Sequence, residues 1–140
     1  MRSFICSIAF LATATFTTVL ADDVHVPAKG SAERKALLDA MRAVQFPKQD
    51  VVYVVNYMKV HNDWAWVDIS PQDRKGQAVA EGGPSLWHCK KGQWTYVDTS
   101  KVPEDPQDPL GPEDASPGFV KNLQKVFRDV PSDIFPKAKK

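Results

Sequence analysis

Residues 51–60 form a nearly unbroken run of β-branched and aromatic side chains, which is typical of a β-strand. Both faces of this strand are apolar, so we expect it to be central in a sheet and covered on both sides for part of its length. Asn62 and Asp63 tolerate the left-handed backbone of a tight turn, and residues 64–69 form the return strand. Alternation divides its side chains between two faces, Trp64, Trp66 and Asp68 on one and Ala65, Val67 and Ile69 on the other.

Two more strands are predicted at residues 85–90 and 93–98, with a turn at Lys91-Gly92. A helix is predicted before the strands, from an N-cap at Ser31 to about residue 44, and another after them, from Pro117 to about residue 128. Residues 103–117 are acidic and proline-rich, and we expect them to run extended over the surface without helix. The predicted fold class is α+β: an N-terminal helix, a four-stranded antiparallel meander and a C-terminal helix.

Residues 1–21 have the pattern of a signal peptide. Arg2 precedes an apolar stretch, and Val19 and Ala21 are small residues at the −3 and −1 positions of a cleavage site. Cleavage leaves residues 22–140, the size of a single domain, with no stable membrane anchor. The predicted location is periplasmic or secreted; an uncleaved N-terminal anchor is the alternative.

Charge and cysteine content limit the classes of partner. The chain has 18 Lys and Arg against 17 Asp and Glu, and this balance argues against binding to nucleic acid or to anionic membranes. Cys6 lies in the predicted signal peptide, so Cys89 is left without a partner for an intrachain disulfide. Its place in an aromatic strand favours a buried thiol; a reactive one is the alternative.

Catalytic and metal-binding patterns are weak in this sequence. His25, His61 and His88 lack the spacing of metal ligands, so no metal, cofactor or catalytic residue is predicted. One enzymatic alternative stays open: Asp68 or Asp63 as a general base. A carboxyl group among indoles has a raised pKa, which suits that role.

Aromatic residues are concentrated on the four predicted strands. If they face the concave side of a curved sheet, they form a pocket for an apolar or sugar-like ligand. If they face the helices, they belong to the core. The candidate ligand-binding residues are Trp64, Trp66, Asp68, Trp94 and Tyr96.

Three segments carry a resemblance to known proteins. Residues 34–42 (Arg-Lys-Ala-Leu-Leu-Asp-Ala-Met-Arg), residues 62–67 (Asn-Asp-Trp-Ala-Trp-Val) and residues 86–94, ending in Gly-Gln-Trp, resemble a group of small exported bacterial proteins that are largely uncharacterised. The resemblance covers residues 34–98 and implies no catalytic residues. The strands are similar, more weakly, to cystatin-like and nuclear-transport-factor-like cone folds, which enclose a ligand or active site in a curved sheet behind helices.

The function expected from these observations is an exported binding module with a protein or cell-wall partner in the cell envelope. The alternative is a small cone-type enzyme with a carboxylate base in an aromatic pocket. A purely structural envelope protein has the same sequence features as the binding module.

Overall fold

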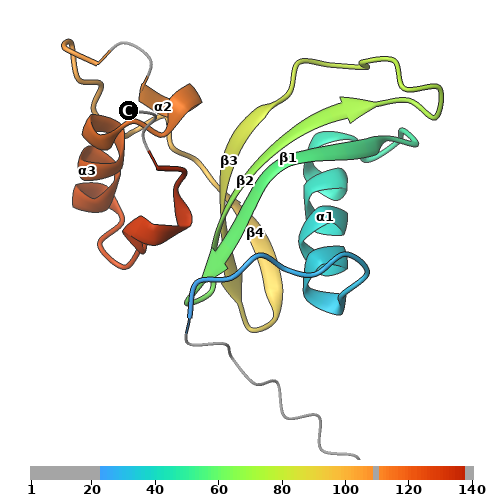
Figure 1. Ribbon diagram of the computed structural model, residues 1–140, viewed down its shortest axis with the longest axis horizontal. Helices are drawn as coiled ribbons and strands as arrows, with labels where there is room; N and C mark the ends of the chain where they lie inside the picture. Colours follow the sequence, from blue (N-terminus) through green and yellow to red (C-terminus); the bar gives the residue numbers. More distant parts are fainter. Residues whose placement is uncertain (1–22, 109–110, 138–140) are drawn as a thin grey trace, which may run out of the picture.

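The computed structural model describes residues 23–108 and 111–137. Helix α1 (Ala32–Gln45) is followed by strands β1 (Val52–His61), β2 (Trp64–Gln72), β3 (Gly83–Lys90) and β4 (Gln93–Val97) (Figure 1). Helices α2 (Gly111–Asp114) and α3 (Pro117–Val126) and the 3₁₀ turn η1 (Ser132–Ile134) come last. The predicted α+β class and its order of helix, meander and helix are confirmed.

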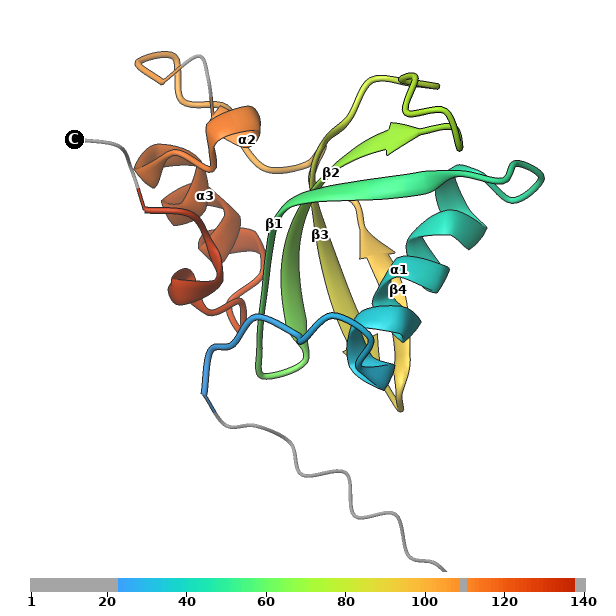
Figure 2. The same ribbon diagram turned by 45° about the vertical axis from the view of Figure 1, so that its right-hand side comes forward.

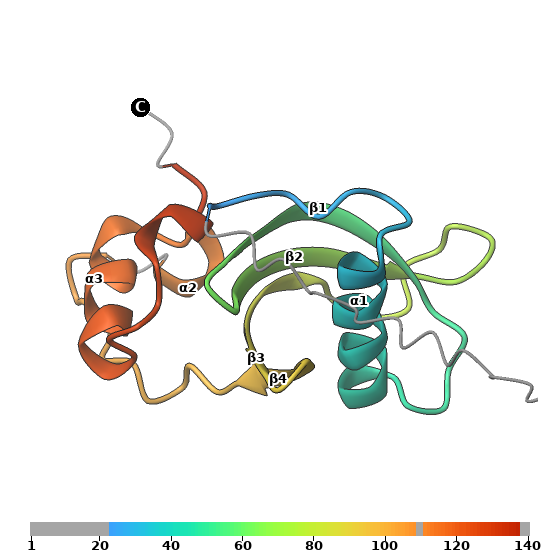
Figure 3. The same ribbon diagram turned by 90° about the horizontal axis from the view of Figure 1, so that it is seen from below.

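The four strands form one antiparallel sheet in the order β1-β2-β3-β4. Asn62 and Asp63 have positive φ angles of 47° and 63°, as the turn between β1 and β2 requires. Figure 3 shows that the sheet curves around α1, which occupies its concave side, whereas α3 lies beyond the opposite side. The sheet therefore separates α1 from the C-terminal helices.

Helix α1 begins as its sequence predicts. The Ser31 hydroxyl accepts a hydrogen bond from the Arg34 amide at 3.2 Å, which satisfies one unpaired N–H of the first turn. Leu37 and Met41 have no exposed surface and pack on the concave face. The buried residues of this first core are Leu37, Met41, Val51, Tyr53, Met58, Val60, Ala65, Val67, Ile69 and Trp87.

A second core lies between the convex face of the sheet and the C-terminal helices. Trp66 is its centre: its ring centroid lies 5.0 Å from that of Phe135 and 6.1 Å from that of Phe119. Leu123 of α3 and Ile134 of η1 are fully buried in it. The predicted division of β2 into two faces is confirmed, because Trp64 and Trp66 belong to this core and Ala65, Val67 and Ile69 to the first.

Strand β1 is at an edge of the sheet, so the prediction of a central strand was wrong. A β-bulge between Val55 and Tyr57 shifts the register by one residue and keeps Val55 and Met58 on the α1 side. The first half of β1 leaves its other face open, and Val52 is 45% exposed. The apolar residues of that other face, Val52 and Val54, therefore stay partly exposed, and an apolar face did not imply a covering layer.

The proline-rich segment also differs from the prediction, because it contains helix α2. Proline is tolerated in the first turn of a helix, where its missing N–H would have no partner within the helix. The next helix begins as expected: Ser116 caps α3 by accepting from the Phe119 amide at 3.2 Å.

The predicted signal peptide, residues 1–21, lies outside the described residues. Within residues 23–108 and 111–137, no helix has both the length and the apolar character needed to cross a membrane. The first described segment pairs with β1: the His25 and Val60 amides each donate to the other residue's carbonyl at 2.9 Å.

Candidate functional site

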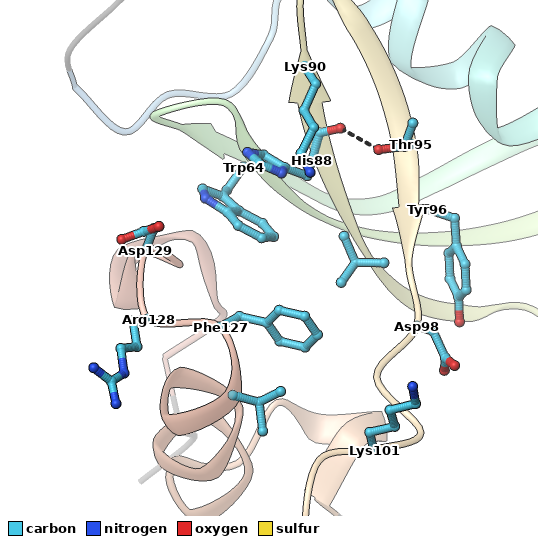
Figure 4. Close-up of a pocket in the computed structure, with 12 residues that line it drawn as sticks. Trp64, His88, Lys90, Thr95, Tyr96, Asp98, Lys101, Phe127, Arg128 and Asp129 are labelled. Atoms are coloured by element: carbon cyan, nitrogen blue, oxygen red, sulfur yellow. Dashed lines mark hydrogen bonds between the residues drawn. The ribbon is translucent and has the colours of Figure 1, made fainter.

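A cleft of about 700 Å³ opens between the convex face of β3 and β4 and the C-terminal end of α3. Figure 4 shows its lining: aromatic and aliphatic side chains in the middle and charged side chains at the two ends. The residues around it are Trp64, His88, Lys90, Thr95, Tyr96, Val97, Asp98, Lys101, Val126, Phe127, Arg128 and Asp129.

The inner wall is a stacked pair of rings, Trp64 and His88. These residues are directly opposite each other in the β2–β3 ladder, so their side chains leave the same face of the sheet. Their ring centroids lie 4.0 Å apart and their planes differ by 4°. Burial lowers the pKa of His88, and the positive charge of Lys90 lowers it further. The imidazole is therefore neutral at neutral pH, which suits an apolar wall.

The end of α3 supplies the opposite wall. The Phe127 amide donates to the Leu123 carbonyl at 2.8 Å, which fixes the residue at the helix terminus. The Phe127 ring points toward the strands (Figure 4), with its centroid 6.3 Å from that of Trp64. Val126 beside it is 44% exposed. The α3 wall of the cleft is therefore apolar, with one half-buried ring and one exposed aliphatic side chain.

Charges are arranged unevenly around this apolar centre. At one end Asp98 and Lys101 lie close together, and Arg128 points away from the cleft (Figure 4). The hydroxyl and amide of Ser100 donate to the Asp98 carboxylate, and this lowers its pKa, with a smaller contribution from Lys101. At the hairpin end Lys90 has Lys91 beside it in the turn. The carboxylates that act on His88, Asp63 and Asp129, lie on the β1–β2 turn and beyond α3, so the β4 side of the hairpin end is the more positive one.

The five predicted ligand-binding residues are divided between the two faces of the sheet. Trp64 lines the cleft, and Trp66 lies on the same face but is only 3% exposed, within the second core. Trp94 packs against the first core, on the α1 side. Tyr96 has its ring on that side too, 5.7 Å from Trp87, but it is at the sheet edge and borders the cleft. The structure therefore brings together Trp64 and Tyr96 alone.

Asp68, the fifth candidate, is not among the residues that line the cleft. Its carboxylate accepts a hydrogen bond from Asn56 at 3.4 Å on an exposed part of the sheet. Asp63, the other carboxylate considered as a base, is exposed in the β1–β2 turn. The concave face, where a cone-type fold would have its pocket, is packed against α1.

Cys89 is half-buried, less than its sequence context suggested. Burial raises the pKa of its thiol, with a smaller effect from Asp63, so the thiol stays protonated at neutral pH. In the described part of the chain, no three His, Cys, Asp or Glu side chains are grouped closely enough to hold a metal ion.

The sequence interpretation missed several residues that form the cleft, above all His88, Val126 and Phe127. The sequence pattern assigned His88 no binding role, and Phe127 fell within the predicted helix of residues 117–128. His88 could have been found only from its position opposite Trp64 in the β2–β3 ladder. That register cannot be read from the sequence, because the connection between β2 and β3 is long.

Comparisons with protein-family models, with curated proteins and with solved structures found no match to this chain. The resemblance to small exported bacterial proteins stays a prediction.

Proposed function

We propose that the chain is an exported binding module of the cell envelope, which holds an apolar side chain of a partner protein in the cleft between β3–β4 and α3. The cleft carries this proposal. Its volume of about 700 Å³ is in the usual range for ligand sites. Its apolar centre and charged ends are the pattern of a small interface with a buried anchor residue.

The burial of the tryptophan side chains favours a protein partner over a cell-wall sugar. Of the four tryptophans, Trp64, Trp66 and Trp87 are at most 7% exposed and Trp94 is half-buried. His88 covers one face of Trp64. A sugar ring would need an open indole plane, whereas an aliphatic or aromatic side chain can fill the space between Phe127 and Val97.

The matched pair Val126 and Val44 tests this proposal. Both are exposed valines near the end of a helix, at 44% and 57%, but Val126 borders the cleft and Val44 lies on α1. A photo-crosslinking benzoylphenylalanine at each position would be activated in envelope extract containing the mature protein. We expect a specific protein adduct from position 126 and none from position 44.

Unlabelled wild-type protein should suppress the adduct, and unlabelled Val126→Glu should not, because a carboxylate in the cleft wall repels an apolar group. Equal adducts at both positions, or none at either, would contradict the proposal. Adducts that a cell-wall glycan suppresses and protein does not would identify the sugar-type partner instead.

The envelope location rests on the sequence of residues 1–21. In a bacterial host, protein recovered from the periplasm or medium should have an intact mass that begins at Asp22. Protein found only with Met1 and the apolar stretch attached would contradict export with cleavage.

A further inference from the structure

The two edges of the sheet differ in how far the described residues cover them. At the β1 edge, the bulge between Val55 and Tyr57 interrupts the regular ladder, and His25 pairs with Val60 through two hydrogen bonds of 2.9 Å. Bulges and added pairings are common means of blocking a sheet edge. At the β4 edge, no described residue forms a β-pairing with the outer side of the strand.

The hydrogen-bond pattern identifies which backbone groups of β4 face outward. The Cys89 amide donates to the Asp63 carbonyl at 2.7 Å, away from β4. Cys89 and Trp94 are therefore a non-hydrogen-bonded pair of the β3–β4 ladder, and alternation makes Trp87 and Tyr96 another. The N–H and C=O of Tyr96 thus point to the open edge of β4. The N–H and C=O of Val60 point outward from the β1 edge in the same way, but there they are hydrogen-bonded to His25.

Tyr96 is the accessible point of this edge. Helix α1 lies close to β4 at the hairpin end and diverges from it toward the end of the strand (Figure 2), and Tyr96 is 48% exposed. Its neighbours Thr95 and Val97 face the cleft. In a strand that pairs with β4, the residue opposite Tyr96 would point away from the cleft. Its two neighbours, opposite Thr95 and Val97, would point toward the cleft.

We propose that the partner binds by adding an antiparallel strand to the outer edge of β4 at Tyr96, with an apolar side chain over Val97 and an acidic one beside Thr95 and Lys90. This inference rests on the proposed function and specifies its partner. In an antiparallel strand the residue opposite Val97 comes first, so the recognised pattern is apolar, any residue, acidic. The central residue exchanges two backbone hydrogen bonds with Tyr96, as His25 does with Val60.

Charge complementarity supports the acidic position. Lys90 and Lys91 lie at the β3–β4 turn, whereas Asp63 and Asp129 face this end of the cleft from the β2 and α3 sides, so the edge of β4 meets the positive side; at the other end Asp98 and Lys101 offset each other. A carboxylate two residues after the apolar side chain would meet the positive end. The reversed order would place it beside Asp98.

The probe is a fluorescein-labelled peptide, Thr-Thr-Phe-Thr-Glu-Thr-Thr, measured by fluorescence anisotropy with the mature protein. The control is the reversed peptide, Thr-Thr-Glu-Thr-Phe-Thr-Thr, which has the same composition. We expect the reversed peptide to bind at least about fivefold more weakly, since it loses either the charge match or the antiparallel pairing. Equal affinity of the two peptides would overturn the proposed direction and pattern.

The variants Tyr96→Pro and Tyr96→Ala isolate the backbone contribution, because both remove the phenol and only proline removes the outward N–H. Proline at this position leaves the β3–β4 ladder intact, because proline fits an edge strand where the N–H faces solvent. We expect Tyr96→Pro to bind about tenfold more weakly than Tyr96→Ala. Equal binding by the two folded variants would overturn strand addition.

Amide hydrogen exchange of the wild-type protein tests the same contact without a variant. The Tyr96 amide should exchange rapidly in the free protein and slow at least about tenfold with saturating peptide, while the Thr95 and Val97 amides are protected in both states. No change at Tyr96 would overturn the proposal.

The peptide experiment also separates this inference from the proposed function. If Val126→Glu weakens peptide binding but Tyr96→Pro and Tyr96→Ala bind equally, the cleft proposal stands and strand addition is overturned. If the free protein sediments as a dimer and Tyr96→Pro as a monomer, the edge holds a second copy of the chain, which overturns the partner proposal.

Discussion

Trp66 joins the sheet to the C-terminal helices, and its replacement by alanine gives the sharpest test of the two-core architecture. The side chain is 3% exposed and contacts the rings of Phe119 and Phe135 on opposite parts of the C-terminal region. In the Trp66→Ala variant the second core would lose its centre, whereas the first core on the other face of the sheet would keep all its side chains.

The expected loss of stability follows from the buried area. An aromatic side chain of this kind buries about 150–250 Å², which at about 25 cal/mol per Å² corresponds to roughly 4–6 kcal/mol. Large-to-small replacements of buried aromatic residues cost about 3–5 kcal/mol in measured series. We expect the free energy of unfolding to fall by about 4 kcal/mol. With a urea dependence of about 1.5 kcal/mol per M, the midpoint falls by about 2–3 M.

The assay is urea unfolding followed by far-UV circular dichroism, with Trp66→Phe as the control. Phenylalanine keeps a ring against Phe135, so we expect less than half of the loss. Amide exchange should increase first in α3, while amides of α1 keep most of their protection. A loss below about 1 kcal/mol for Trp66→Ala would refute the reasoning. The large expected loss also makes Trp66→Ala unsuitable as a probe of binding, because it would displace α3 and with it the cleft.

Two further predictions concern buried polar groups and pH. The Ser85 hydroxyl accepts a hydrogen bond from the Trp87 indole N–H at 2.8 Å in a buried position, so Ser85→Ala should cost about 1–3 kcal/mol in urea unfolding, against less than about 0.5 kcal/mol for the exposed Thr95→Ala. His25 lies 2.8 Å from the Glu33 carboxylate, and that contact raises its pKa above 6.5. The His25–Glu33 contact therefore stabilises the fold fully at pH values below 6.5, and this effect is lost as the pH rises through the raised pKa of His25. The Val60 amide, which pairs with His25, should be better protected from hydrogen exchange at pH 5.5 than at pH 8, after correction for intrinsic rates. The Glu33→Gln variant should remove that difference.

Local sequence signals were sufficient to predict most of the fold. Ser31 and Ser116 fixed the starts of α1 and α3, and the Asn62-Asp63 and Lys91-Gly92 turns defined the two tight hairpins. These features depend on interactions within a few residues, so one sequence is enough to recognise them. The predicted central position of β1 was wrong because composition does not show that the apolar residues of its second face, Val52 and Val54, stay partly exposed at the sheet edge.

The candidate site was less predictable for a related reason. Alternation within β2 correctly grouped Trp64 with Trp66, but it does not say which face of β4 continues the same side of the sheet. That depends on the register between β2 and β3, across a connection of ten residues that has no short-turn signature. Trp94 and Tyr96 consequently fall on the α1 side, and the cleft is completed by His88 and Phe127 instead.

The bulge in β1 also affects how this chain can be compared with any relative. The extra residue at Asn56 reverses the parity of inward and outward positions, so odd-numbered residues face α1 before it and even-numbered residues after it. A homologue with a regular strand would be one residue shorter at this point. An ungapped alignment would then match core positions to surface positions over half of the strand, and apparent substitutions there would reflect a shift in phase rather than a change in selection.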